Sequence, residues 1–347
     1  MSRIPSLALA SAGALLLAAC NDVSQPTAAR PSDADLQQNP PHLGITPVRT
    51  PGGPRFTNNG NELNHGDAPP SSGGPSTQSA TTGILYHGGP VLQAGTNVAA
   101  VYWAATTIYQ GGPTPGSTGL GTADGSNVGF FMSHVGGSPY FNINTTYTNS
   151  AGLAISNVVN YTQFWANNSY NVPGTKTRVT DANMISMLQY AFNNGKLTYD
   201  PNTLYAIFTA GTVNLGGGFG TQYCAYHTHG TVTIAGVSRT VLYAAMPDAY
   251  AKATACSNGT KSPNNDPHAD AVVSVLVHEI EETTTDEMGN AWYDSSGYEN
   301  ADKCAWNFGA TYTTANGGVA NVNLGGKDFL IQQNWINANT GGCRLSW

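Results

Sequence analysis

Apolar and polar residues alternate in a regular way only after about Thr82. Beyond that point, five runs rich in Val, Ile, Tyr and Thr predict strands, at Gly83–His87, Asn97–Trp103, Leu204–Thr212, Thr231–Ile234 and Thr240–Ala245. Three runs with helical spacing predict helices, at Asn127–Val135, Asp181–Asn194 and Pro267–Met288. This mixture predicts an α+β fold, in which helices pack on a mixed or antiparallel sheet within a single domain.

The third predicted helix is expected to lie in the middle of the domain. Asp266 and Pro267 form a cap and a first turn, and Gly289 provides a stop after Met288. Between these signals, Ala269–Leu276 is apolar on nearly every face. A helix without a polar face is buried, so this segment predicts a central buried helix.

The N-terminus is typical of an export signal. Arg3 precedes an apolar run from Leu7 to Ala19, which is too short for a permanent membrane helix. Small residues then lead directly to Cys20, the pattern that lipoprotein processing requires. We therefore predict a signal peptide over 1–19 and lipidation of Cys20; the alternative is an ordinary secretory signal with an incidental cysteine. Asn21 after Cys20 favours the outer membrane or cell surface of a Gram-negative bacterium.

Residues 20–80 are rich in Pro, Ser, Gly and Asn and poor in apolar residues. Such a segment cannot bury enough surface to fold alone, so it predicts a disordered tether. The remaining residues, 81–347, are numerous enough to bury a core as one domain. They contain no apolar stretch long enough to cross a bilayer, so the lipid anchor is the only membrane contact that we expect.

Composition narrows the functional class. Only 10% of residues are charged, 41 are glycine, and the net charge is −7 without a basic patch. These features are typical of a secreted, turn-rich domain and argue against nucleic acid as a partner. Apart from Cys20, four cysteines are present, which predicts two disulfides in an oxidising compartment. We favour the pairing of neighbours, Cys224–Cys256 and Cys304–Cys343, among three possible connectivities.

The candidate chemistry follows the apolar run of the third helix. If His278 is placed at an angle of zero on a helical wheel, Glu282 lies at about 40°, Asp286 at about 80° and Glu279 at about 100°. His278 and Glu282 are one turn apart, a separation at which two side chains can share a metal ion. Glu279 beside them could accept a proton from a metal-bound water.

The charge in this segment also favours a cation. With Glu281, four acidic residues fall within eight positions, and no lysine or arginine occurs between Lys261 and Lys303. A bound cation resolves this repulsion more naturally than protonation. The simpler interpretation is a solvated acidic helix end with a core histidine, and a third is a structural metal site.

His278-Glu279-x-x-Glu282 resembles the H-E-x-x-H helix of zincin metallopeptidases, with Glu in the second ligand position. The downstream residues resemble the gluzincin pattern, which implies His278, Glu282 and Glu299 as ligands and Glu279 as general base. In that pattern Asp286 orients His278, and Asp302 is the rival third ligand. The implied cofactor is Zn²⁺, but this harder ligand set also admits Mn²⁺ or Ca²⁺.

A wider resemblance, to the phosphate-induced protein 1 (EXORDIUM-like) family, covers most of the domain. Three segments carry it: Tyr86–Leu92, Cys224–His227, and Gly325–Gln332 with the continuation through Trp335 to Cys343. The plant members of this family are secreted, wall-associated proteins linked to growth. The family therefore implies an extracellular protein but does not by itself imply an enzyme.

His227 and His229 follow Cys224 in what we interpret as a glycine-rich loop. They could donate hydrogen bonds to a tetrahedral intermediate, although packed or exposed histidines are more common beside a disulfide. Two functions result. The first is a surface or periplasmic metallohydrolase, most simply a peptidase, acting on a peptide or envelope polymer. The second is a non-enzymatic protein that binds wall or extracellular polysaccharide, with a structural metal or none.

Overall fold

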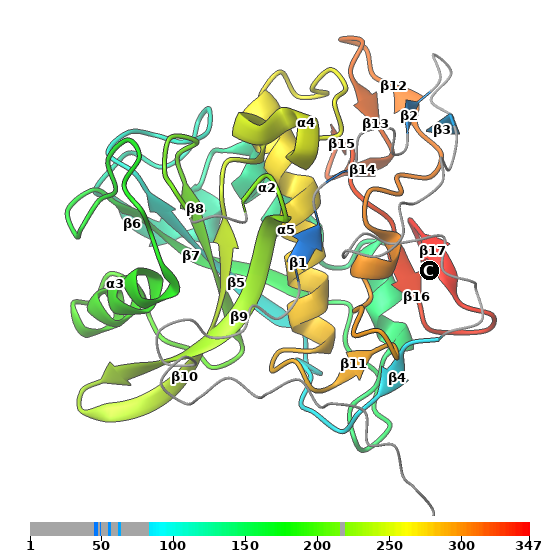
Figure 1. Cartoon of the computed structure of the whole chain (residues 1–347), viewed down its shortest axis with the longest axis horizontal. Coiled ribbons are helices and arrows are strands. Elements are labelled where there is room, and N and C mark those ends of the chain that lie inside the picture. Colours follow the sequence, from blue (N-terminus) through cyan, green and yellow to red (C-terminus); the bar gives the residue numbers. More distant parts are fainter. Residues whose placement is uncertain (1–44, 48, 50–54, 57–61, 64–82, 216–218) are drawn as a thin grey trace, which may run out of the picture.

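A mixed seven-stranded sheet runs through the centre of the computed structural model, which describes residues 45–47, 49, 55–56, 62–63, 83–215 and 219–347 (Figure 1). The strand order is β1-β9-β10-β8-β5-β7-β6, and the four inner strands from β10 to β7 are parallel. The bounds are β1 Ile45–Pro47, β5 Thr96–Trp103, β6 Thr118–Leu120, β7 Val159–Asn167, β8 Thr203–Thr209, β9 Tyr223–Ile234 and β10 Val237–Met246. The predicted α+β class with a mixed sheet is confirmed.

Helices cover both faces of the sheet. Helices α2 (Asn127–His134) and α5 (Pro267–Thr285) pack on one face, and α3 (Asp181–Asn193) packs on the other. Successive side chains of a strand point to opposite faces, so Ala100 and Tyr102 join the core under α5, whereas Val101 and Trp103 join the core under α3. The inner strands are therefore apolar on both sides, as buried parallel strands are.

Helix α5 is central and buried, as predicted, but it ends earlier than Met288. The Asp266 side chain caps its N-terminus by accepting the Ala269 N–H. At the other end, three threonines at 283–285 bond back to carbonyls of the preceding turn, and Asp286 leaves the helix with φ −152°. Consecutive β-branched residues are poor helix formers, and an aspartate after them competes for backbone donors, which explains the early end.

The strand predictions locate the inner strands β5, β8 and β10 but miss β1, β6, β7 and the first half of β9. Strands β5, β8 and β10 overlap the predicted runs, and the run at Gly83–His87 shortens to β4, Leu85–Tyr86. Strand β7 was not predicted. Strand β9 begins at Tyr223 rather than Thr231, so the segment interpreted as a glycine-rich loop after Cys224 is a strand whose side chains are largely buried. Polar residues on both faces hide its alternation.

Short paired segments complete the side of the domain next to α5. Strand β4 pairs with β11 (Trp292–Tyr293), and β16 (Asn334–Ile336) pairs with β17 (Gly342–Arg344). Further hairpins join β12 (Tyr312–Thr313) to β13 (Val319–Ala320), β14 (Val322–Leu324) to β15 (Lys327–Phe329), and β2 (Arg55–Phe56) to β3 (Glu62–Leu63). The short helical segments are η1 Gly121–Ala123, η2 Phe141–Thr146, η3 Ala249–Lys252, α4 Ala253–Cys256 and η4 Asp302–Cys304.

Both predicted disulfides are confirmed. Cys224 on β9 is bonded to Cys256 at the end of α4, and Cys304 in η4 is bonded to Cys343 on β17. The first bond joins an edge of the sheet to the segment that leads into α5. The second joins the C-terminal hairpin to η4, next to Asp302.

The predicted tether is not entirely free of structure. Strand β1 lies within it, and its residues pair antiparallel with β9, Thr46 facing Ala225. The prediction considered only whether this segment could fold alone. Strand β9 offers an edge of unpaired backbone groups, and a short segment with β-branched residues such as Thr46 can pair with it. The export signal over 1–19 and Cys20 lie outside the described residues, so both stay predictions.

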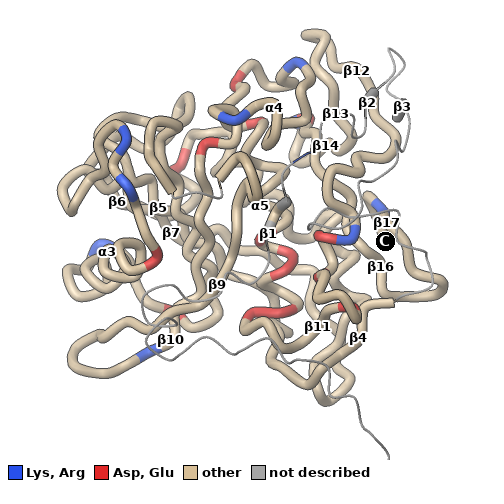
Figure 2. Tube along the Cα trace, viewed as in Figure 1, with Lys and Arg blue, Asp and Glu red and all other residues tan. Residues whose placement is uncertain are grey.

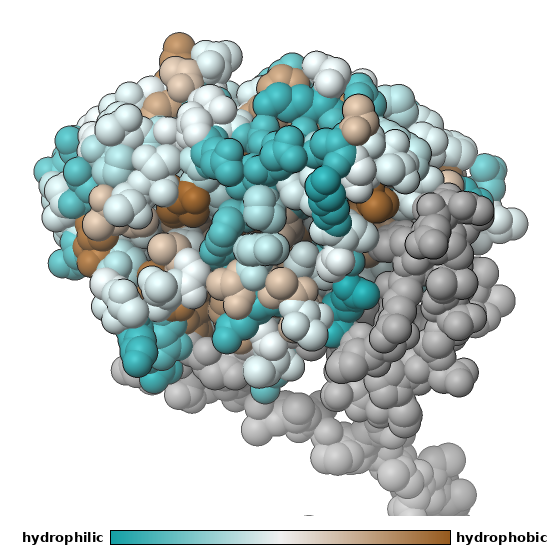
Figure 3. Space-filling view, turned by 90° about the horizontal axis from the view of Figure 1, so that it is seen from above, coloured by the Kyte–Doolittle hydropathy of each residue, from teal (hydrophilic) through white to brown (hydrophobic). Residues whose placement is uncertain are grey.

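Among the described residues, no helix is long and apolar enough to cross a bilayer. The large apolar side chains that are exposed, such as Leu85, Leu120 and Val237, lie on separate elements, and the view in Figure 3 is mostly hydrophilic with small apolar patches. Acidic residues, in contrast, gather around the C-terminal half of α5, while most Lys and Arg lie at the periphery (Figure 2).

Candidate metal centre

Two of the predicted ligands meet on α5. His278 Nε2 lies 2.9 Å from Glu282 Oε1, one helical turn away. Asp302 reaches them from η4, because its backbone N–H donates to Glu282 Oε1 at 3.0 Å and its Oδ1 lies 3.4 Å from His278 Nε2. These three residues are buried, and one ligand atom from each lies within 4.8 Å of the others. They form the first triad.

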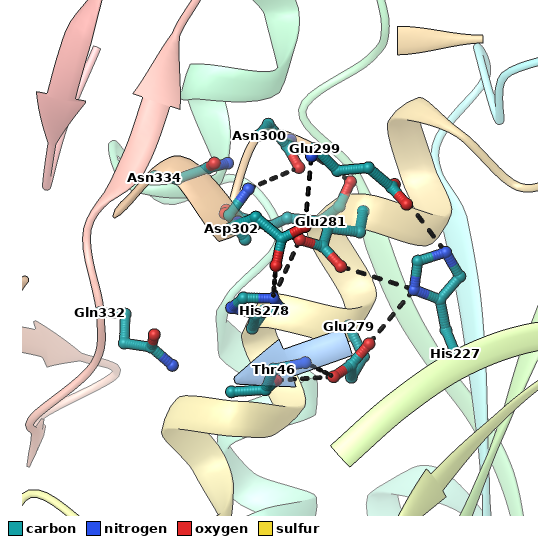
Figure 4. Close-up of polar contacts among 12 residues, drawn as sticks. Thr46, His227, His278, Glu279, Glu281, Glu299, Asn300, Asp302, Gln332 and Asn334 are labelled. Carbon is teal, nitrogen blue, oxygen red and sulfur yellow. Dashed lines mark hydrogen bonds and ion pairs between the residues drawn. The ribbon is translucent and has the colours of Figure 1, made fainter. Parts of the chain in front are cut away.

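A second triad shares Glu282 and recruits a side chain from the sheet. His227 on β9 places Nδ1 3.2 Å from Glu279 Oε2 and 3.6 Å from Glu282 Oε2 (Figure 4). One ligand atom each from His227, Glu279 and Glu282 again lies within 4.8 Å of the others. The carboxylate of Glu282 therefore faces a different histidine with each of its oxygens.

Glu299 and Glu281 border the two triads in different ways. Glu299 Oε2 lies 3.9 Å from His227 Nε2 and belongs to neither triad. Glu281 points to the other side of α5, where it accepts hydrogen bonds from Tyr140 and from Asn144. The acidic run on α5 is therefore divided: Glu279 and Glu282 serve the centre, and Glu281 serves the buried polar contacts behind it.

Both oxygens of Glu279 are engaged. Oε2 faces His227, whereas Oε1 accepts the backbone N–H of Thr46 at 3.1 Å and the Thr46 hydroxyl at 2.6 Å (Figure 4). Thr46 is itself completely buried. The residue predicted to act as general base is thus covered by a strand from the N-terminal segment, which sequence reasoning did not anticipate.

The buried charges conflict strongly. Burial raises the pKa of Glu282 to about 7, and the neighbouring Asp302 contributes to the increase. Burial and the Glu282 carboxylate also raise the pKa of Glu299 well above its usual range. Burial alone would lower the pKa of His278, but Glu282 and Asp302 outweigh it and raise this pKa well above normal. Like charges held together in an apolar interior are what a bound cation relieves.

Unpartnered atoms test whether a metal ion fits. Four buried side-chain atoms that face this cluster make no hydrogen bond in the described structure, namely His227 Nε2, His278 Nε2, Glu282 Oε2 and Glu299 Oε2, although each lies 2.9–3.9 Å from an imidazole nitrogen or carboxylate oxygen of the cluster. Leaving buried polar atoms unsatisfied costs about 1–3 kcal/mol each. Imidazole and carboxylate are the ligands that zinc and related divalent ions take in proteins, so the donor set fits such an ion.

The other predicted site residues are placed as follows. Asp286 does not orient His278; outside the helix, its Oδ1 accepts the backbone N–H groups of Asn290 and Ala291 at 2.6 and 2.7 Å. Asp302 takes the place beside His278 instead. His229 lies on the same strand as His227 but outside both triads, and burial together with His227 lowers its pKa.

His227 lies on a strand and not in the predicted loop. It is completely buried on β9 and meets two glutamates of α5. A local signal existed in its alternation with His229, since residues two apart in a strand share a face. That signal was usable only if the segment was recognised as a strand.

The chain belongs to the family described as phosphate-induced protein 1 conserved region, whose family model matches residues 132–329. The match begins near the end of α2 and includes the sheet from β7 to β10, α5 and η4, so all residues of both triads lie within it. Thr46 and β1 lie outside the match. No curated protein and no solved structure matches the chain.

Proposed function

We propose that this protein is an exported, divalent-metal-dependent hydrolase that cleaves peptide bonds. The observation that carries the proposal is the convergence of buried imidazole and carboxylate atoms around Glu282, which make no hydrogen bond and face only one another. The first triad, His278, Glu282 and Asp302, would hold the ion, preferably Zn²⁺. When bound, such an ion supplies Lewis acidity and lowers the pKa of a coordinated water.

The remaining residues would handle the proton. Glu279 lies one position after His278 and outside the first triad, which suits it to accept a proton from the attacking water. His227, 3.2 Å from Glu279 Oε2, would stabilise the carboxylate and could pass the proton on toward the leaving group. Glu299 beside His227 Nε2 would hold the imidazole in place.

A second candidate is favoured by one feature, the burial of the triads, in which the Asp302 side chain keeps an exposed fraction of 13%. Structural metal sites are closed, whereas catalytic ones keep a position open. In this alternative the protein binds an extracellular polymer, and the ion only stabilises the fold. The two functions predict different effects of replacing Glu279, because a hydrolase needs this residue as a base and a structural ion does not.

The test is the metal content of the full chain, purified without chelator, beside the double variant His278→Ala/Glu282→Ala. We expect stoichiometric metal that the double variant loses. Glu279→Gln should then keep the metal and the thermal stability but lose turnover of a mixed fluorogenic peptide library by about 10²- to 10⁴-fold. Bound metal without any Glu279-dependent turnover would favour the structural site. Absence of metal after addition of Zn²⁺, Mn²⁺ or Ca²⁺ would exclude the hydrolase and leave the polymer-binding protein without a metal.

A further inference from the structure

Strand β1 occupies the position from which Glu279 would be reached. Thr46 donates both its backbone N–H and its hydroxyl to Glu279 Oε1, at 3.1 and 2.6 Å, while Oε2 is held by His227. Oε1, with two donors, has no lone pair left for a water molecule, so the strand leaves Glu279 only the second lone pair of Oε2, beside His227. The contact is therefore inhibitory for any reaction that uses Glu279 as a base.

Hydrogen bonds of Arg49 hold β1 beside the candidate metal centre at a second point. Just beyond the strand, the Arg49 backbone N–H donates to the Ala255 carbonyl at 2.6 Å, and Arg49 Nη1 donates to the Ser257 carbonyl at 3.1 Å. Ala255 and Ser257 flank Cys256, whose disulfide partner Cys224 lies on β9 beside the residues that pair with β1. The disulfide thus ties together the two surfaces on which this segment rests.

The attachment is nevertheless small. Strand β1 is three residues long, pairs along one edge of β9, and lies outside the segment that the family shares. Short edge strands contribute little to global stability and open locally at low free-energy cost. The segment is therefore held firmly enough to cover Glu279 and weakly enough to leave without unfolding the domain.

We propose that Ile45–Pro47 is an autoinhibitory strap, which keeps the metal centre closed until it is displaced or removed. This inference rests on the proposed hydrolase function, because it assigns regulation to the same site. It also accounts for the burial of Glu279: the closed state described by the structure is the resting state, and departure of Thr46 exposes this carboxylate.

The experiment compares the full chain with Thr46→Val, which removes the hydroxyl donor and keeps the shape, and with Arg49→Ala, which removes the side-chain anchor. Thr240→Val, an exposed position on β10, is the matched control. The first readout is the rate at which a chelator extracts bound Zn²⁺, and the second is turnover of the peptide library. Circular dichroism and thermal melting confirm that each variant is folded.

We expect Thr46→Val to release Zn²⁺ about tenfold faster and to raise turnover by a similar factor, with Arg49→Ala changing both in the same direction. Thr240→Val should match the wild type. Unchanged release and turnover in both strap variants, with metal still bound and the wild type active, would overturn the strap alone. Equal acceleration in Thr240→Val would also overturn it. If no variant binds metal, the proposed function and the strap fail together.

Discussion

His227 Nδ1 lies 3.6 Å from Oε2 of Glu282, although one side chain comes from strand β9 and the other from helix α5. The opposite oxygen of Glu282 lies 2.9 Å from His278 Nε2. One carboxylate therefore connects the ligand pair within the helix to the residue that the sheet contributes. Among the described residues that could hold an ion, Glu282 is the member common to both triads.

This shared position makes Glu282 the most sensitive ligand. In Glu282→Gln the side chain keeps its shape but loses its charge, and both triads lose a member. We expect metal affinity, measured by competition with a chromogenic chelator, to fall by at least about 100-fold, because losing only an outer-shell partner costs about 10- to 100-fold.

Glu281→Gln provides the control on the same helix. Glu281 is equally buried but accepts from Tyr140 and Asn144 behind α5, and burial raises its pKa well above the usual range. An amide in its place should leave metal affinity unchanged. Equal losses in the two variants would show that the acidic helix, rather than the triads, attracts the ion.

Replacing the two histidines of β9 should have different effects on turnover. His227 faces Glu279 and Glu282, whereas His229 belongs to neither triad. We expect His227→Asn to reduce turnover of the peptide library at least tenfold while leaving the His278 triad able to bind metal. His229→Asn should change turnover by less than about twofold. A larger effect of His229→Asn would place the reacting groups on the outer part of β9 instead.

Comparing His227 with His278 shows which contacts of the site can be predicted from the sequence. Periodicity was sufficient to predict that His278 and Glu282 meet, because residues one turn apart on a helix are neighbours whatever surrounds them. The contact of His227 with α5 depends on how the sheet packs against the helix, and no local pattern encodes that distance. Asp286 was misplaced for a related reason, since its predicted angle assumed a helix that in fact ends at Thr285.

The position of Thr46 could not be predicted from composition. Its surroundings are rich in proline and polar residues, a composition that predicts no independent folding. The segment needs no core of its own, however, because β9 supplies backbone partners and Glu279 supplies an acceptor. The disulfides were predicted more easily, because pairing cysteines that are neighbours in sequence required no knowledge of packing.

Glu287 provides a test of pH dependence. Partial burial and the nearby Asp286 raise its pKa to about 7, from an ordinary value of 4.5. Between these two pH values the folded protein holds more protons at this group than the unfolded chain, so its contribution to stability declines as the pH rises through this range. Above about pH 7 both states are ionised, and the unfavourable contribution is complete.

Replacing Glu287 with Gln should remove this decline. Thermal unfolding followed by circular dichroism, with wild type and Glu287→Gln measured side by side from pH 4.5 to 8, should show a variant that gains melting temperature relative to the wild type as the pH rises. The gain should level off above about pH 7. A difference between the two proteins that stays constant across this range would contradict the raised pKa.

The two disulfides should have similar effects on stability and different effects on metal binding. They close loops of comparable length, with sequence separations of 32 and 39, so removing either pair should cost about 2–5 kcal/mol of unfolding free energy. Cys304 follows Asp302 within the short segment η4, whose backbone also donates to Glu282. In Cys304→Ala/Cys343→Ala, Asp302 loses the covalent support that holds it beside His278, so metal affinity should fall about tenfold as well.

Denaturant unfolding and chelator competition measure the two effects. The Cys224→Ala/Cys256→Ala protein is the control for lost stability, because that bond ends on β9 and α4, outside the first triad. It is compared by equilibrium affinity and not by release rate, since that bond also supports the segment that carries Thr46. If it weakens metal binding as much as the loss of Cys304–Cys343 does, the loss of affinity reflects general destabilisation rather than the position of Asp302.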